Sequence, residues 1–145
     1  MMQEPLFFRS MSKSAGCFSP AVRLGDYVYI SGQLPLDHKR GVLAGETIEE
    51  QTRAVIHNIG FLLKEAGLDL RYVLKTTVYL QDVDDFQAFN KVYMELFQSP
   101  YPAASVIGVS SLPYGAKIEI DAFAIDTRAL EVMCAGECKG NACGI

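Results

Sequence analysis

Apolar and polar positions alternate over short stretches near the start of the chain. Two β-type runs, Ala21–Leu24 and Tyr27–Ser31, flank a Gly25-Asp26 pair, and this pattern predicts a β-hairpin. The following segment, Gly32–Gly45, is rich in Gly, Pro and charged residues, so we expect a loop there.

A helical period replaces the alternation from Thr47 to Ala66. Thr47 and Glu50 have the Thr-x-x-Glu spacing of a capping box, in which each residue bonds the backbone of the other. Gly67 follows where a glycine can end the helix with a positive φ. Apolar residues recur at helical spacing within the segment: Ile48, Val55, Ile59, Leu62 and Ala66.

A strand and a second helix follow. Tyr72–Leu80 is dense in Val, Thr and Tyr, which favours a strand. Asp82 can cap a helix over Val83–Phe97, and Pro100–Pro102 prevents that helix from continuing. This helix carries an aromatic and apolar stripe that we expect to pack against a sheet: Phe86, Phe89, Tyr93, Leu96 and Phe97.

Two further strands are predicted, Ala103–Ser110 and Lys117–Ile125, around a turn at Leu112–Gly115. The order β-β-α-β-α-β-β is typical of an α+β two-layer sandwich, with both helices packed on one face of a mixed sheet. Along Lys117–Ile125 the second face carries charged residues and some apolar surface, which suits contact between subunits.

Composition narrows the class of protein. The 145 residues are enough for one domain with its own core, and 50% hydrophobic against 21% charged residues excludes a disordered chain. The apolar surplus favours burial against partner subunits. A net charge of −4 argues against nucleic acid as a partner, because phosphate backbones attract basic surfaces.

The sequence also bears on location and on its thiols. No apolar run is long enough for a membrane helix and the amino end lacks the pattern of a secretory signal, so we expect a cytoplasmic protein without a membrane partner. Cys17 is expected to be a reduced thiol, because the chain does not resemble a short secreted disulfide scaffold. It is not expected to be a nucleophile, because the sequence places neither histidine near it. The other cysteines are Cys134, Cys138 and Cys143.

Several short motifs occur in one order between Gly16 and Ile125, and together they resemble the RidA/YjgF family of imine and enamine deaminases, also called the endoribonuclease L-PSP family. The motifs are Ser31-Gly32-Gln33, Gln51-Thr52, Asn58-Ile59, Gly67, Val73–Leu80, Asp85-Phe86, Asn90, Tyr93 and Ile118–Ala122.

The resemblance implies a chorismate-mutase-like fold and a homotrimer with ligand clefts between neighbouring subunits. It implies hydrolysis of 2-imino acids to 2-oxo acids and ammonia, a hydrolase reaction without a metal or another cofactor. On this basis residues 1–126 form a single RidA-like domain, and residues 127–145 form a C-terminal tail with three of the cysteines. The Cys-x3-Cys-x4-Cys spacing of the tail leaves a metal site open as an alternative, but zinc sites more often contain Cys-x-x-Cys pairs and four ligands.

The resemblance also assigns roles to residues of a site. Glu119 takes the position of the catalytic glutamate that orients water, whereas the residue pattern without the resemblance favours a solvated strand residue. We expect the remaining site residues to bind substrate or support the cleft: Phe18, Ser31, Asn90, Ala104 and Ser105.

Ala104 is the main departure from the family pattern. The family motif Pro-Ala-Arg-Ser/Thr holds the substrate carboxylate through its arginine, whose forked guanidinium matches two carboxylate oxygens. Here Pro102 is followed by two alanines and Ser105. Phe18 also replaces a tyrosine and so lacks its hydroxyl, and Pro20 replaces a glutamine. These changes argue against a standard 2-imino acid as the substrate.

Two functions therefore stay open. The first is hydrolysis of an imine, an enamine or a related small reactive metabolite, supported by Glu119, Asn90 and Ser31. The second is a non-catalytic trimer that binds a small metabolite for regulation, which the alanine at position 104 favours. Ribonuclease activity is disfavoured by the acidic balance and by the absence of a histidine pair or basic stripe.

Overall fold

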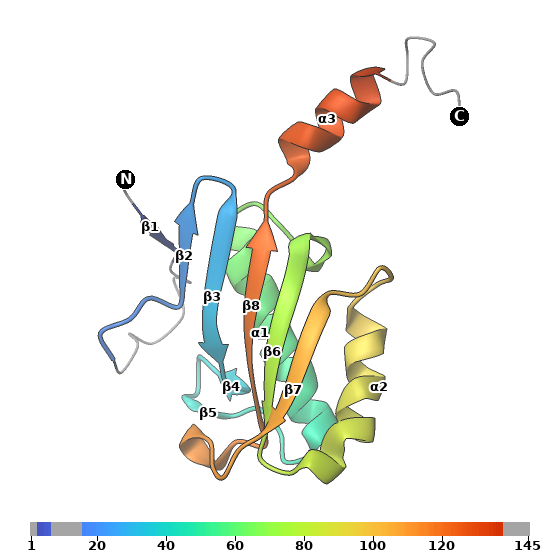
Figure 1. The fold of residues 1–145 in the computed structure, drawn as a ribbon. Coiled ribbons are helices and arrows are strands. Elements are labelled where there is room, and N and C mark those ends of the chain that lie inside the picture. Colours follow the sequence, from blue (N-terminus) through green and yellow to red (C-terminus); the bar gives the residue numbers. More distant parts are fainter. Residues whose placement is uncertain (1–2, 7–15, 138–145) are drawn as a thin grey trace.

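The computed structural model describes residues 3–6 and 16–137 (Figure 1). Within these residues, six strands form one mixed sheet in the order β1-β2-β3-β8-β6-β7, in which only β6 and β7 are parallel. The strands are β1 (Glu4–Leu6), β2 (Ala21–Leu24), β3 (Tyr27–Gln33), β6 (Val73–Leu80), β7 (Ala103–Gly108) and β8 (Ile118–Ile125), with a separate pair β4 (Leu36–Asp37) and β5 (Val42–Leu43). The α-helices are α1 (Ile48–Glu65), α2 (Phe86–Leu96) and α3 (Arg128–Glu137).

Helices α1 and α2 lie side by side behind one face of the sheet, and the other face carries no helix (Figure 1). The core fills the space between these layers, with fully buried side chains from α1 and from the central strands. They include Val55, Ile56, Ile59, Leu62 and Leu63 of the helix and Val28, Val78, Leu80, Ile118 and Ile120 of the sheet. The predicted α+β class and the placement of both predicted helices on one face are therefore confirmed.

The first helix begins at the predicted capping box. The Thr47 hydroxyl accepts a hydrogen bond from the Glu50 amide at 3.2 Å, and the Glu50 carboxylate accepts one from the Thr47 amide at 3.1 Å. The helix ends at Glu65 with Ala66 as its C-cap, and Gly67 takes a φ of +72°, a conformation that glycine adopts without strain. The sequence prediction for this helix is confirmed at both ends.

The second helix starts later than predicted. Val83–Asp85 form a 3₁₀ turn, because the Asp82 carboxylate accepts the Asp84 amide at 2.9 Å, and the α-helix begins at Phe86. Phe86 is 39% exposed, so its predicted packing against the sheet is wrong. The other aromatic residues of the stripe are buried as predicted: Phe89, Tyr93 and Phe97.

The predicted loop at Gly32–Gly45 contains regular structure. β3 continues to Gln33, and the short strands β4 and β5 pair around a turn in which Asp37 accepts the amides of Lys39 and Arg40. Gly41 follows with a φ of +69°. This turn chemistry, rather than hydrophobic alternation, forms the hairpin, which is why the pattern of the sequence missed it.

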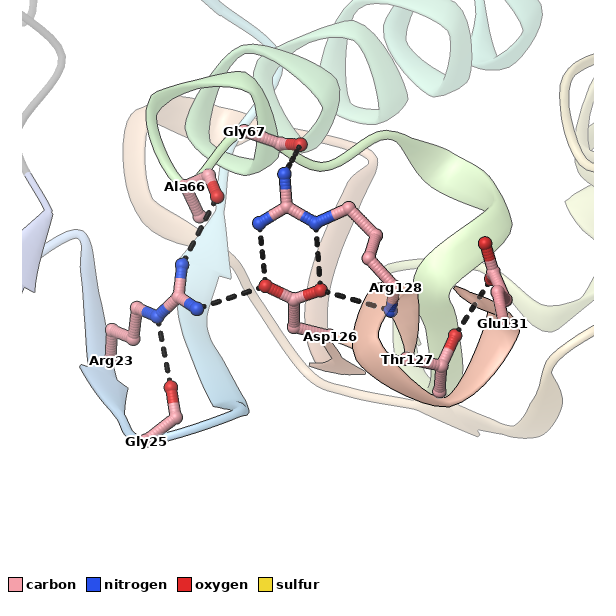
Figure 2. Close-up of polar contacts among 8 residues, drawn as sticks. All are labelled: Arg23, Gly25, Ala66, Gly67, Asp126, Thr127, Arg128 and Glu131. Atoms are coloured by element: carbon pink, nitrogen blue, oxygen red, sulfur yellow. Dashed lines mark hydrogen bonds and ion pairs between the residues drawn. The ribbon is translucent and has the colours of Figure 1, made fainter. Parts of the chain in front are cut away.

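Asp126, just after β8, accepts hydrogen bonds from two arginines (Figure 2). Arg128 donates to its carboxylate from Nε at 2.8 Å and Nη2 at 2.6 Å, and Arg23 of β2 donates from Nη2 at 2.9 Å. The same guanidinium groups donate to the carbonyl oxygens of Ala66 and Gly67, both at 3.1 Å, where cations complement the dipole of α1. This network ties the start of α3 to the sheet and to α1.

The network predicts a pH-dependent contribution to stability. Hydrogen bonds from Arg128 and Arg23 hold the pKa of Asp126, whose side chain is 8% exposed, far below its ordinary value. Asp126→Asn should lower the free energy of unfolding at pH 7 by about 1–3 kcal/mol. Because the folded pKa is depressed, the contribution is present above the unfolded pKa and declines as pH falls toward the folded one. The difference should therefore be smaller at pH 3.

Urea unfolding at pH 7 and pH 3 measures this difference. Asp84→Asn is the matched control, because Asp84 is an exposed aspartate in another part of the fold. An equal loss at both pH values would show that the ionised Asp126 carboxylate is not the stabilising group.

Helix α3 projects from the end of β8 away from the sheet (Figure 1). Cys134 on this helix is exposed and free, as is Cys17, whereas Cys138 and Cys143 lie outside the described residues. Among residues 3–6 and 16–137, no cluster of His, Cys, Asp and Glu has the arrangement of a metal site. No helix in this part of the chain has the length and apolar character needed to cross a membrane.

Candidate active site

A cleft of about 490 Å³ lies on the face of the sheet that carries no helix, across β3, β8 and β6. Two predicted site residues with polar side chains, Ser31 and Glu119, line this cleft. Phe18, from the segment before β2, lines it as well. The charged and hydroxyl side chains that line it are Tyr29, Ser31, Lys75, Glu119 and Asp121. The fold thus brings Phe18, Ser31 and Glu119 together, as the sequence predicted.

A β-bulge in β3 shapes one wall of the cleft. Ile30 pairs with Ala122 and Gln33 pairs with Ile120, so that Ser31 and Gly32 together face a single residue of β8, Asp121. A bulge of this kind bends its strand and changes the direction of its side chains, and such bulges are common beside active sites. The Ser31-Gly32-Gln33 motif of the sequence is therefore the motif that forms the bulge.

Ser31 fastens the segment that carries Phe18. Its hydroxyl donates to the Ser19 carbonyl at 2.7 Å, and its amide donates to the Pro20 carbonyl at 2.9 Å. Gln33, which is buried, donates from Nε2 to the Ser31 carbonyl at 2.9 Å. Ser31 thus positions the mouth of the cleft as well as lining it.

Glu119 is half-buried in the cleft. Burial, and secondly the negative charge of Asp121, raise the pKa of Glu119 above the ordinary glutamate value. A carboxylate with a raised pKa is better matched to proton transfer near neutral pH than an ordinary glutamate. Its chemistry is compatible with the predicted role of orienting water and would also suit proton transfer.

The Glu119 carboxylate lies against the backbone of the bulge. A Cβ atom added at Gly32 would overlap Oε1 of Glu119, so this approach requires glycine. Glycine is needed here for space rather than for backbone conformation, since no positive φ occurs at this position.

Because the Glu119 carboxylate lies against Gly32, adding a methyl group at position 32 should change the activity of the protein. Gly32→Ala should displace the carboxylate and lower turnover about tenfold or more, because small misplacements of a catalytic group are costly. The melting temperature should change little, because the overlap is with the end of a side chain. Gly60→Ala is the matched control, since a Cβ at Gly60 meets nothing within 4 Å. Similar activity losses in both variants would contradict the assignment.

Asp121 is held by a neighbouring tyrosine. The Tyr79 hydroxyl of β6 donates to Oδ2 of Asp121 at 3.0 Å, and this hydrogen bond, together with burial and the Asp121 charge, raises the pKa of Tyr79. The phenol therefore stays protonated and donates to the Asp121 carboxylate, which lies beside Glu119 in the cleft.

A second bulge, in β6, directs Lys75 to the cleft. Val73 pairs with Ala124 and Lys75 pairs with Phe123, so that Leu74 is the extra residue of β6. The Lys75 ammonium donates to the Thr76 carbonyl at 2.9 Å and to the hydroxyl of Ser105 at 3.0 Å. Neither bulge was predicted, because hydrophobic alternation alone does not reveal one extra residue in a strand.

The other predicted site residues lie outside this cleft in the single chain. Ser105 is next to it on β7 and touches it only through Lys75. Ala104 pairs with Thr76, whose buried side chain lies on the helix-covered face of the sheet. Ala104 therefore lies on that face and not on the face with the cleft, and it is exposed because β7 is an edge strand. Asn90 of α2 donates to the Met94 sulfur at 3.5 Å, rather than to a loop backbone. The buried asparagine that donates to backbone carbonyls, those of Leu34 and Leu36, is Asn58 of the Asn58-Ile59 motif.

Comparison of the sequence with known protein families identifies the family of this chain. The family model described as Endoribonuclease L-PSP matches residues 9–126. The chain belongs to the RidA/YjgF family. The resemblance inferred from the motifs is thereby confirmed, and α3 lies beyond the residues that the family model matches.

Named relatives cover nearly all of the domain. A RutC family protein of Pyrococcus horikoshii is 42% identical over 123 residues, which are 85% of this chain and 98% of that protein. The human 2-iminobutanoate/2-iminopropanoate deaminase is 41% identical over 110 residues, or 76% of this chain and 80% of that protein. RidA from the Antarctic bacterium Psychrobacter is 33% identical with a TM-score of 0.81, covering 85% of this chain and 99% of its own.

Proposed function

We propose that this RidA-family protein is a cofactor-independent hydrolase that converts a small imine or enamine to the corresponding carbonyl compound and ammonia. The observation that carries the proposal is the half-buried Glu119, whose raised pKa and position against Gly32 suit a group that activates water. The name of the human relative, a 2-iminobutanoate/2-iminopropanoate deaminase, supports the same class of reaction.

Hydrolysis of an imine needs only modest assistance from the protein. The carbon of a protonated imine is already electrophilic, so a positioned water and departure of ammonia are enough. Glu119 accepts a proton as the water attacks, which gives a carbinolamine, and can return a proton to the amine as it leaves. The cleft supplies position and a preorganised environment rather than a covalent intermediate.

The proposed assembly is a homotrimer with the complete site between two copies. The helix-free face exposes Tyr27 (47%) and Tyr29 (51%), whose rings contact Phe123, and β7 leaves Ile107 exposed. An apolar sheet face of this kind favours burial against another copy. In this arrangement Ala104, Ser105 and Asn90 of a neighbouring copy complete the cleft that contains Glu119.

Sedimentation velocity at micromolar concentration tests the assembly. We expect one species at three times the 16.0 kDa chain mass. A stable species at the mass of one chain would contradict the trimer and the completion of the cleft by a neighbour.

The test of the reaction generates imines in solution. An amine oxidase produces imines without a carboxylate, an amino-acid oxidase produces 2-imino acids, and semicarbazide traps the imine that remains. We expect the protein to lower the trapped signal in proportion to its concentration for at least one imine, and only weakly for 2-iminobutanoate and 2-iminopropanoate. If the amount of trapped imine is the same with the protein as in buffer alone for every imine, the proposal that the protein is a hydrolase is contradicted.

A second candidate is a trimer that binds a small metabolite for regulation without turnover. Ala104 favours it, because the chain lacks the arginine that holds a substrate carboxylate in the family pattern. The two candidates differ in one observable: a binder changes its ligand affinity when the cleft is mutated but never accelerates loss of an imine.

A further inference from the structure

The charges that line the cleft are unbalanced. Glu119 and Asp121 contribute two carboxylates, and Lys75 is the one cationic side chain among the described residues that line it. The Lys75 ammonium is directed to the Thr76 carbonyl and to Ser105, rather than to either carboxylate. The lining therefore carries a net negative charge when both acids are ionised.

Aromatic rings form the apolar part of the same cleft. Phe18, Tyr29 and Phe123 line it, and the rings of Tyr29 and Phe123 are in contact with centroids 4.9 Å apart. The faces of aromatic rings attract cations as well as apolar groups. Carboxylates beside aromatic rings suit an organic cation with an apolar body.

Two hydroxyl groups in and beside the cleft are already engaged as donors. The Ser31 hydroxyl proton is already donated to the Ser19 carbonyl, and the Tyr79 hydroxyl is donated to Asp121. A ligand carboxylate would therefore lie near two like charges, with Lys75 as its counterion only if that lysine left its present partners.

We propose that the cleft selects organic cations without a carboxylate: protonated imines and amines whose nitrogen lies between Glu119 and Asp121 and whose apolar part lies against Phe18, Tyr29 and Phe123. This inference rests on the proposed function, because it names the substrate class of the same site. The reaction is R₂C=NH₂⁺ + H₂O → R₂C=O + NH₄⁺, in which the carbon–nitrogen bond breaks and the water oxygen becomes the carbonyl oxygen.

The direct test uses stable ligands of similar shape and different charge. Calorimetry on the native protein compares benzylammonium with benzoate and benzyl alcohol, and pyrrolidinium with its neutral analogue cyclopentanol. We expect each cation to bind at least about fivefold more tightly than its neutral or anionic partner, the scale of one charge interaction at a partly buried site. Equal binding within both sets, or tighter binding of benzoate, would overturn the proposal.

Two substitutions keep shape while removing charge. Asp121→Asn retains an acceptor for the Tyr79 hydroxyl, and Glu119→Gln retains the size of its side chain. Each substitution should weaken the binding of benzylammonium about threefold to tenfold and leave the affinity for benzyl alcohol unchanged. Asp84→Asn, at an exposed aspartate outside the cleft lining, is the control and should change neither. Equal weakening of both ligands in the cleft variants would overturn the charge assignment.

These measurements separate the inference from the proposed reaction. Selective cation binding without turnover of any imine would support the ligand class and contradict the hydrolase. Rapid hydrolysis of 2-iminobutanoate, with no preference for cations, would support the hydrolase and contradict the ligand class.

Discussion

Glu119→Gln should lower kcat/KM for the best imine substrate by about a hundredfold or more, the usual contribution of a positioned acid–base group. The amide has nearly the same size but cannot accept the proton of an attacking water. The oligomeric state and the melting temperature should be those of the native protein, because Glu119 lies at a cleft rather than in the core.

The pH profile distinguishes a catalytic carboxylate from a structural one. Burial and Asp121 raise the pKa of Glu119, so activity should rise with pH through a midpoint above the ordinary glutamate value. This limb should disappear in Glu119→Gln and persist in Glu49→Gln, a control at an exposed glutamate on α1. Native activity in Glu119→Gln would exclude this residue as the group that activates water.

The second large effect is a gain of activity. Ala104→Arg should raise kcat/KM for 2-iminobutanoate by roughly tenfold to a hundredfold, because a charge-assisted hydrogen bond contributes about 1.5–3 kcal/mol. The exposed position of Ala104 at the edge of β7 leaves room for the longer side chain in a single chain. The gain should be absent for an imine without a carboxylate.

Ala104→Gln is the matched control for this gain. It supplies length and hydrogen-bonding groups but no charge, so it should leave the 2-iminobutanoate rate near that of the native protein. A folded Ala104→Arg variant that is no faster than the Ala104→Gln variant would show that position 104 does not face the substrate carboxylate.

The sequence predicted most of the fold because its signals were local. The capping box at Thr47 and Glu50 is satisfied within four residues, and the periodic face of α1 has one way to be buried against a sheet. The start of α2 was misplaced because an aspartate cap at Asp82 serves a 3₁₀ turn as well as an α-helix.

Three of the six predicted site residues line one cleft, whereas Asn90, Ala104 and Ser105 lie outside it in the single chain. Resemblance to a family placed Phe18, Ser31 and Glu119 together, and the cleft contains all three. The bulges at Ser31-Gly32 and Leu74 depend on pairing between strands distant in sequence, which a linear pattern does not report. The Arg23–Asp126–Arg128 network joins residues up to 105 positions apart for the same reason, and the fold had to bring them together before their charges could interact.

A crystal structure of the native protein soaked with benzylammonium tests the central claim most directly, because it shows both the ligand and the neighbouring copy. We predict the ammonium between Glu119 and Asp121, the ring against Phe18, and Ala104 of an adjacent subunit at the edge of the same cleft. A ligand bound elsewhere, or a cleft that no neighbouring copy approaches, would contradict the proposed site.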